Sequence, residues 1–194
     1  MNKRLNIWIV MILAAGVLGF AYIEGYAKPK KEEKGIQYEA AQKNPQTHDI
    51  RRTARYKNKY MGNASNLGGL NGTLPYDGRT YTFRLDPDQL KAELIFDELL
   101  NLAEKEAGVF RQKLLYNSTA NFVYIDNLQT LQLSFPDAVF TVKRSKVSNW
   151  FGGDERLAGL QDAGQWKEEV QQKLSDPTFA DKFYEQTVDI VVKE

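Results

Sequence analysis

Side chains that commonly carry catalysis are scarce in this sequence. His48 is the only histidine and cysteine is absent, so a histidine-based triad, a thiolate nucleophile and a cysteine or histidine metal cluster all lack their components. His48 stands in a polar stretch, where we expect a solvated side chain. Carboxylate acid–base chemistry remains available, and its closest approach to a pair is in turn-forming sequence at Asp86, Asp88, Asp97 and Glu98. We expect no catalytic residue, metal or cofactor; the alternative is a cell-envelope hydrolase that uses these loop carboxylates.

Two large aromatic residues are the best candidates for recognition of a partner. Trp150 and Phe151 directly precede Gly152 and Gly153. Large aromatic side chains dominate binding hot spots, and a flexible diglycine beside them favours an exposed anchor. Aromatic side chains are also the main content of protein cores, so a plug at the end of the core is an equally good interpretation.

A basic run offers a second candidate surface. Arg51, Arg52 and Arg55 are interleaved with Tyr56 and Tyr60. Clustered cations beside stacking rings suit an anionic polymer or lipid headgroups, so an accessory factor that binds anionic wall polymer is a further alternative. A solvated lead-in to the folded domain is the competing interpretation, because charge runs usually face solvent.

The N-terminal segment predicts the compartment. Residues 5–23 are almost entirely apolar and follow Lys3 and Arg4, and the 17 residues from Ile7 to Ile23 carry no charge. This is the lower limit of length for a membrane-spanning helix, and the preceding cations predict a cytoplasmic N-terminus. We expect residues 1–27 to be a membrane anchor, with secretion after cleavage behind Ala27 as the alternative. Residues 28–48 are charged and polar and predict a flexible tether.

Residues 49–194 predict one extracytoplasmic α+β domain. Alternating apolar residues indicate strands at 80–85 and 90–96, and again at 131–135 and 140–142, each pair joined by a proline-containing turn. Helical spacing indicates helices at 67–74, 110–125 and 166–174, whereas 97–108 suits a helix or an elaborated loop. Phe179, Phe183 and Ile190 favour a last helix, although 188–192 would equally suit an edge strand. The resulting fold is an antiparallel sheet of two hairpins with helices on one face, preceded by a transmembrane helix.

A series of short motifs resembles a known family. The series runs through Tyr60-x-Gly62-Asn63, Leu67-x-x-Leu70, Leu74-Pro75, Tyr116-Asn117-Ser118-Thr119 and Ile125-Asp126-Asn127-Leu128. Over roughly residues 49–154 the chain resembles DUF4825, an extracytoplasmic domain of unknown function of Gram-positive bacteria. The resemblance implies a fold and an envelope location, and it brings no catalytic residue. The chain differs from lipoprotein members in lacking a lipid-modified cysteine.

Together these features predict a membrane-anchored extracytoplasmic binding or sensory domain of the bacterial cell envelope. The absence of cysteine in an exported domain favours a bacterial host. Net charge is +1, which argues against a dedicated polyanion binder, and no nucleic acid is expected as a partner. The expected partners are the membrane, through the N-terminal helix, and an unknown envelope protein or ligand.

Overall fold

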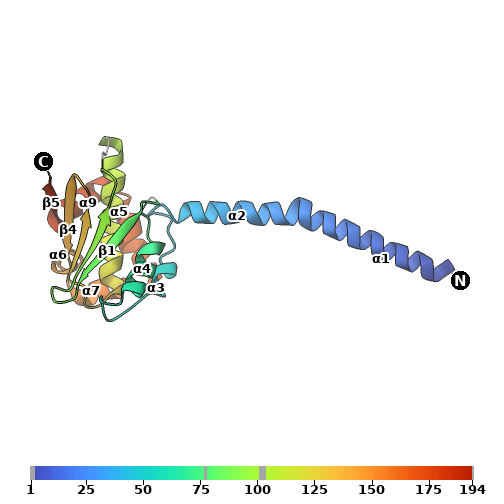
Figure 1. Cartoon of the computed structure of the whole chain (residues 1–194), viewed down its shortest axis with the longest axis horizontal. Coiled ribbons are helices and arrows are strands. Elements are labelled where there is room, and N and C mark those ends of the chain that lie inside the picture. Colours follow the sequence, from blue (N-terminus) through green and yellow to red (C-terminus); the bar gives the residue numbers. More distant parts are fainter. Residues whose placement is uncertain (1–2, 77, 101–103, 194) are drawn as a thin grey trace. The chain divides into compact units, whose positions relative to one another are not determined.

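The computed structural model describes residues 3–76, 78–100 and 104–193. The chain divides into two compact units, residues 1–41 and residues 42–194. Each unit is described by itself below, and Figure 1 labels their elements.

The first unit is helical throughout its described part. It consists of α1 (Lys3–Tyr22), a π-helical stretch η1 (Ile23–Ala27) and α2 (Lys28–Ala41). Polar pairs four residues apart line the helix surface, with Lys28 beside Glu24 and Gln37 donating to Glu33. Within the residues that the structure describes, no helix has the length and hydropathy needed to span a membrane.

The second unit combines one sheet with a set of helices. Its first half contains α3 (Arg51–Ala54), α4 (Ala64–Thr73), β1 (Tyr81–Asp86), β2 (Lys91–Phe96) and α5 (Glu104–Tyr124). Its second half contains β3 (Thr130–Ser134), β4 (Ala138–Lys143), α6 (Arg144–Phe151), α7 (Asp154–Gly159), α8 (Ala163–Trp166), the π-helix η2 (Lys167–Gln172), α9 (Pro177–Thr187) and β5 (Val188–Val192). Both endings predicted for the chain are therefore present, helix α9 followed by edge strand β5. Of the ambiguous stretch 97–108, residues 101–103 lie outside the described residues.

The sheet has five strands in the order β1-β2-β3-β4-β5. The two predicted hairpins, β1–β2 and β3–β4, are present and antiparallel, and β5 adds antiparallel to β4. The prediction of a purely antiparallel sheet was wrong, because β2 pairs with β3 in parallel. The physical reason is α5: parallel neighbours require a long crossover, and this 21-residue helix supplies it. The α+β class holds, with a mixed sheet.

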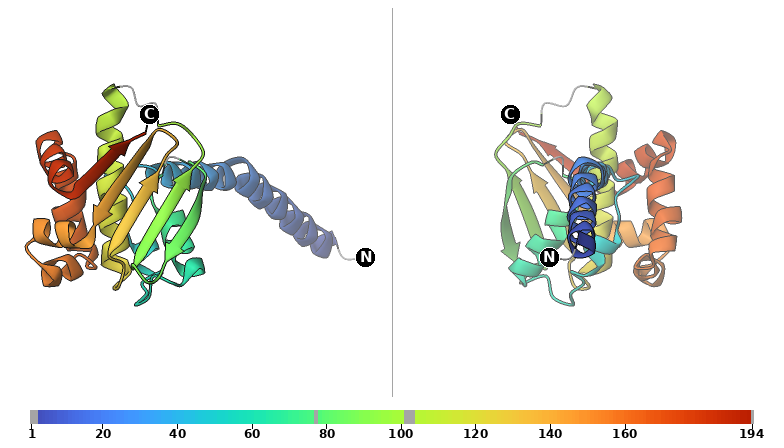
Figure 2. Two further views of the ribbon diagram at one scale, coloured as in Figure 1. Left: turned by 60° about the vertical axis from the view of Figure 1, so that its left-hand side comes forward. Right: turned by 90° about the vertical axis from the view of Figure 1, so that its right-hand side faces the viewer.

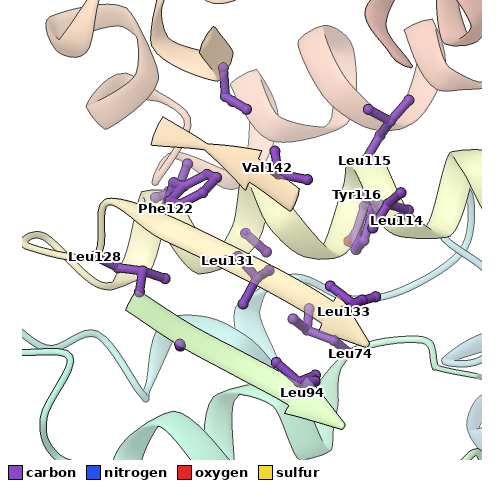
Figure 3. Packing of buried hydrophobic residues seen from close by; sticks show 14 of the residues in the cluster. Leu74, Leu94, Leu114, Leu115, Tyr116, Phe122, Leu128, Leu131, Leu133 and Val142 are labelled. Atoms are coloured by element: carbon purple, nitrogen blue, oxygen red, sulfur yellow. The ribbon is translucent and has the colours of Figure 1, made fainter. Parts of the chain in front are cut away.

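Within the described part of residues 42–194, one face of the sheet packs on α5, α4 and α9, and no helix of this unit covers the other face (Figure 2). Leu94, Leu131, Leu133 and Val142 point from three adjacent strands toward α5 and are buried (Figure 3). The predicted apolar stripe of α5 faces these strands. Its residues Leu114, Ser118, Phe122 and Ile125 are buried, and Phe110 is half-buried. The period-2 strands and the period-3.6 helix thus meet in one core.

The open face of the sheet contains a polar row. A row of paired positions crosses all five strands there and consists of Arg84, Glu93, Gln132, Thr141 and Asp189. Glu93 is buried within this row, accepting a hydrogen bond of 2.6 Å from Ser134 Oγ and lying 3.4 Å from Arg84. These cross-strand contacts stabilise the face that lacks helices.

Residues 28–48 differ from the predicted flexible tether. Residues 28–41 form α2, and the compact domain begins at Gln42, seven residues before the predicted start at Asp49. Gln42 and His48 are both buried, with His48 only 2% exposed, so the expectation of a solvated His48 was wrong. Its burial follows from partners far away in the sequence, which are described next.

Candidate functional site

Two adjoining hollows on α6, α7, η2 and α9 form the candidate site. Their volumes are about 260 Å³ and 220 Å³, and both are lined by Phe151, Arg156 and Glu169. Leu160, Gln165 and Glu168 complete the first hollow, and Trp150, Lys173 and Phe179 complete the second. We call the two together the aromatic groove. They contain both residues, Trp150 and Phe151, that the sequence predicts as recognition candidates.

The aromatic floor of the groove is fixed by ring packing. The Trp150 ring stacks on Phe183 with centroids 4.9 Å apart and an interplanar angle of 5°, and it meets Phe179 edge-on at 5.2 Å. Phe151 meets the same Phe183 edge-on at 5.5 Å. Phe183 is fully buried, whereas Trp150, Phe151 and Phe179 are half-buried. Both interpretations from the sequence therefore apply: these rings close one end of the core and also present an outer surface.

Gly152 positions these aromatic residues. It has a φ of +89°, which places it in the left-handed region, and it ends α6 immediately after Phe151. Its N–H donates to Asn149 O at 3.1 Å, and the N–H of Gly153 donates to Ser148 O at 2.8 Å. This pair of bonds is the Schellman motif, which satisfies the last carbonyls of the helix. The diglycine is therefore a helix terminus that orients Trp150 and Phe151 toward α9.

Charged side chains border the aromatic floor. Lys173 lies 2.5 Å from Glu169 and its Nζ is 6.0 Å from the Phe179 ring centroid. Arg156 and Glu168 are exposed. Glu168 and Glu169 are consecutive on a helix, so their carboxylates diverge rather than converge on one atom. The groove is thus suited to bind an apolar group flanked by charge, and its described lining contains no hydroxyl, thiol or imidazole.

The π-helix η2 connects the groove to residues 45–48, near the start of the domain. Glu168 and Glu169 face the groove from this helix, while Gln171 is buried on it. Gln171 Nε2 donates to Pro45 O at 2.7 Å and to His48 O at 2.9 Å. Short π-helical insertions are frequent at functional sites, because the extra residue re-aims neighbouring side chains. Here one helical turn carries both groove carboxylates and the Gln171 amide that hydrogen-bonds within residues 45–48.

His48 is the centre of a buried hydrogen-bond network that the sequence did not predict. Its Nε2–H donates to Thr73 O at 2.7 Å, and its Nδ1 accepts from Tyr116 Oη at 2.8 Å. Trp166 Nε1–H in turn donates to Tyr116 Oη at 3.0 Å. When His48 is neutral, each of these three hydrogen bonds has one donor proton and one acceptor. Burial lowers the pKa of His48 below its ordinary value, and Arg52 adds to this effect, while the bond to Thr73 and the charge of Asp49 oppose it.

The basic run is separated from the aromatic groove and is largely engaged in local contacts. Arg51 lines a different hollow of about 280 Å³, together with His48, and its guanidinium contacts both oxygens of Asp49 at 2.7 and 2.8 Å. This hydrogen bonding holds the pKa of Asp49 below its usual value. Arg52 is half-buried, and Arg55 lies 4.9 Å from the centroid of the Tyr56 ring. The cations are therefore not gathered into a single free patch.

The two tyrosines of this run have different environments. The Tyr56 ring packs against Gly69 of α4 so closely that a Cβ there would lie 2.2 Å from it. Tyr60 is 61% exposed, with Lys59 Nζ 5.6 Å from its ring centroid. Tyr56 is thus a packing residue, and Tyr60 is the more accessible of the two.

The loop carboxylates do not form a pair. Asp86 accepts from the N–H of Gln89 in the β1–β2 turn, and Asp88 is exposed in that turn. Asp97 and Glu98 follow the opposite end of β2, about 20 Å away at roughly 3.3 Å per strand residue. Glu98 contacts Arg79 at 3.5 Å. The described residues also contain no cluster of three or more His, Asp or Glu side chains that could hold a metal ion.

A further, small hollow of about 20 Å³ lies between α5 and the ends of β2 and β3. Phe96, Phe110 and Phe135 supply most of its wall, and Asn117 reaches it from α5. The Asn117 amide donates to Pro75 O at 3.2 Å, while its Oδ1 has no hydrogen-bond partner among the described residues. The volume accommodates one water-sized group.

The motif residues that suggested a family have structural roles. Asn63 Oδ1 caps α4 by accepting from the N–H of Asn66 at 3.0 Å, and Asn127 Oδ1 accepts from the N–H of Met61 at 2.6 Å. Arg144 donates to the carbonyl of Phe122 in the last turn of α5 and to those of Ile125 and Leu128 just after it, at 2.5 to 2.8 Å. Comparison with protein families matches residues 54–145 to DUF4825, described as a domain of unknown function. Residues 54–145 of the chain therefore resemble DUF4825.

This match confirms the resemblance and narrows it from residues 49–154 to 54–145. The DUF4825 segment comprises α4, β1, β2, α5, β3 and β4, with its ends in α3 and α6. The aromatic groove and His48 lie outside it. Neither the curated proteins nor the solved structures gave a significant match to the chain.

Proposed function

We propose that this protein is a non-catalytic, membrane-anchored binding or sensory domain of the bacterial cell envelope, with the aromatic groove as its ligand site. The ligand is a segment of an envelope protein that inserts an apolar side chain between Trp150, Phe151 and Phe179. Arg156 and Lys173 contact acidic groups beside it, and Glu168 contacts basic ones. Half-buried aromatic rings with a charged rim have the composition of a binding hot spot.

Anchoring is proposed from residues 5–23 and the cations at Lys3 and Arg4. Large apolar side chains of α1 are exposed, with Leu13 at 64%, Val17 at 69% and Leu18 at 71%. Apolar side chains exposed along a helix are stabilised by transfer out of water, and a bilayer provides that environment. In this topology residues 42–194 lie outside the cell.

A sensory role is supported by the two sets of contacts that η2 makes, one with the groove and one with residues 45–48. Its Glu168 and Glu169 line the groove, and its Gln171 holds Pro45 O and His48 O. A ligand that reorients η2 changes the geometry of the two Gln171 bonds. Those bonds position residues 45–48, so binding in the groove affects the N-terminal end of the domain.

Partner capture inside cells tests the binding proposal. A photo-crosslinking amino acid at Trp150 is expected to trap a specific envelope protein in the full chain, and the same amino acid at Thr82, which is exposed on β1, is the matched control. Equal products at both positions would contradict a ligand site in the groove. Gln171→Leu separates binding from signalling: capture at position 150 should persist while residues 42–48 lose protection from hydrogen exchange.

Topology is tested independently because the chain has no cysteine of its own. Tyr60→Cys is expected to react with a membrane-impermeant maleimide in intact cells, whereas Asn2→Cys should react only after permeabilisation. The reverse pattern would exclude the extracytoplasmic location without bearing on the groove.

The two alternatives suggested by the sequence have less support. The carboxylates considered for a hydrolase lie at opposite ends of β2. In the basic run considered for wall polymer, Arg51 is bound by Asp49 and Arg55 lies over Tyr56. Binding that weakens steeply with added salt would favour the polymer alternative over the one proposed.

A further inference from the structure

We propose that β5 is a self-association edge, through which two copies of the chain join their sheets in an antiparallel β5–β5 pair. The starting observation is unusual exposure. Ile190, Val191 and Val192 are 46%, 63% and 76% exposed on consecutive positions of an edge strand. Edge strands with exposed apolar side chains readily pair with another chain.

The other edge of the sheet is different. Thr82 and Arg84 are the exposed residues of β1, while Tyr81, Phe83 and Leu85 pack against the core. Charged and polar residues on an edge oppose pairing with a further strand. Of the two edges, β5 is therefore the one suited to accept a neighbour.

The direction of the β5 peptide groups follows from its pairing with β4. The N–H of Lys193 donates to Asp137 O at 2.9 Å, and the register pairs Val191 with Val139. Because antiparallel strands alternate, the N–H and C=O groups of Val191 and Lys193 face β4, and those of Ile190 and Val192 face away from it. Figure 2 shows β5 as the outermost strand on that side of the sheet.

These outward groups fit a second copy in one particular register. A two-fold axis at Val191 places Ile190 opposite Val192 of the second copy, where both residues exchange N–H···O bonds. The two Val191 side chains then meet as a closely spaced, non-hydrogen-bonded pair. Asp189 lies opposite Lys193 of the second copy, and Lys193 lies opposite its Asp189. The strand is thus complementary to itself in hydrogen bonds, apolar contact and charge.

Each charged partner already has one contact within its own chain. Asp189 Oδ1 accepts from Lys146 at 2.6 Å, which leaves its second oxygen for the neighbour, and Lys193 Nζ donates to Phe135 O at 2.8 Å. Exposed ion pairs add little affinity, so the charges select the register while the backbone bonds and valine contacts hold the strands together.

Disulfide trapping in the full chain tests the register, because no native cysteine interferes. Non-hydrogen-bonded partners lie about 4.5 Å apart at Cα, within disulfide range, so Val191→Cys should form a covalent dimer under mild oxidation. Thr82→Cys on β1 is the matched control and should remain mostly monomeric. Comparable dimer yields from the two variants, or a disulfide to a different polypeptide, would overturn the proposal.

Second-site variants exclude random collision and misfolding. Adding Val192→Pro to Val191→Cys removes one outward N–H per chain and leaves the bonds to β4, so dimer yield should fall about tenfold or more at unchanged thermal stability. Lys193→Asp should lower the yield by placing like charges opposite each other, and Asp189→Lys with Lys193→Asp should restore it. A dimer yield that changes neither with the proline nor with the charge exchange would refute this register.

Discussion

His48 gives the sharpest prediction, because it is the only histidine and it is buried in its neutral form. Below its unfolded pKa of about 6.5 the unfolded chain gains a proton that the folded chain resists. The free energy of unfolding should therefore fall as pH decreases from about 6.5, and stop falling once pH passes the lowered folded-state pKa. One proton difference corresponds to a slope of at most about 1.4 kcal/mol per pH unit.

The structure explains why a proton is resisted. Nε2 already donates to Thr73 O, and Nδ1 accepts from Tyr116 Oη, which itself accepts from Trp166. A second ring proton on Nδ1 would face a hydroxyl that must reverse its hydrogen bond. The charge would also be buried beside Arg52, with Asp49 as the compensating group.

Urea unfolding of the full chain in detergent, at pH 5 to 8, measures this slope. His48→Gln is expected to lose about 1–3 kcal/mol at pH 8, since buried hydrogen bonds are lost, and to show little slope between pH 7 and 5. Carboxylates titrate lower and are unchanged in the variant, so the difference isolates His48. A wild-type stability that is flat over this range, or an equal slope in His48→Gln, would refute the assignment of a neutral buried histidine.

Two further predictions concern stability, one at Arg144 and one at Gly69. Arg144→Met should lower the free energy of unfolding by about 3 kcal/mol, because three hydrogen bonds to carbonyls in the last turn of α5 and just after it are lost at roughly 1 kcal/mol each. The exposed control Arg156→Met should change the free energy of unfolding by less than about 0.5 kcal/mol. Equal effects of the two variants in urea unfolding would contradict the capping role of Arg144. Gly69→Ala should destabilise α4, because its Cβ would meet the Tyr56 ring at 2.2 Å, whereas Gly72→Ala has no atom within 4 Å and should stabilise the same helix by up to about 1 kcal/mol. Thermal melting of the pair would exclude this packing if Gly69→Ala raised the melting temperature.

Local patterns predicted the strands of both hairpins. The alternation of Tyr81, Phe83 and Leu85 and that of Leu131 and Leu133 correspond to strands in the two hairpins. Short turns fix the partner within each hairpin, so sequence distance alone identifies it. The pairing of β2 with β3 depends instead on how α5 crosses the sheet, which no period-2 pattern records.

The burial of His48 was not predictable from its neighbours in the sequence. Its hydrogen-bond partners at Thr73 and Tyr116 are 25 and 68 residues away, and Gln171, which holds its carbonyl, is 123 residues away. A polar stretch with two prolines nearby resembles a tether when its partners are unknown. One available signal was overlooked in α2, where polar side chains recur at the i, i+4 spacing that stabilises exposed helices.

The division between scaffold and site follows the limits of the DUF4825 segment. Inside residues 54–145, the side chains of Asn63, Asn127 and Arg144 form hydrogen bonds with backbone groups. Trp150 and η2 follow the DUF4825 segment in the sequence. Backbone capping restricts the residue type at a position, whereas a groove rim can change its charges without disturbing the fold. Chains that share the DUF4825 scaffold are therefore expected to keep the capping residues and to differ in the residues of the groove.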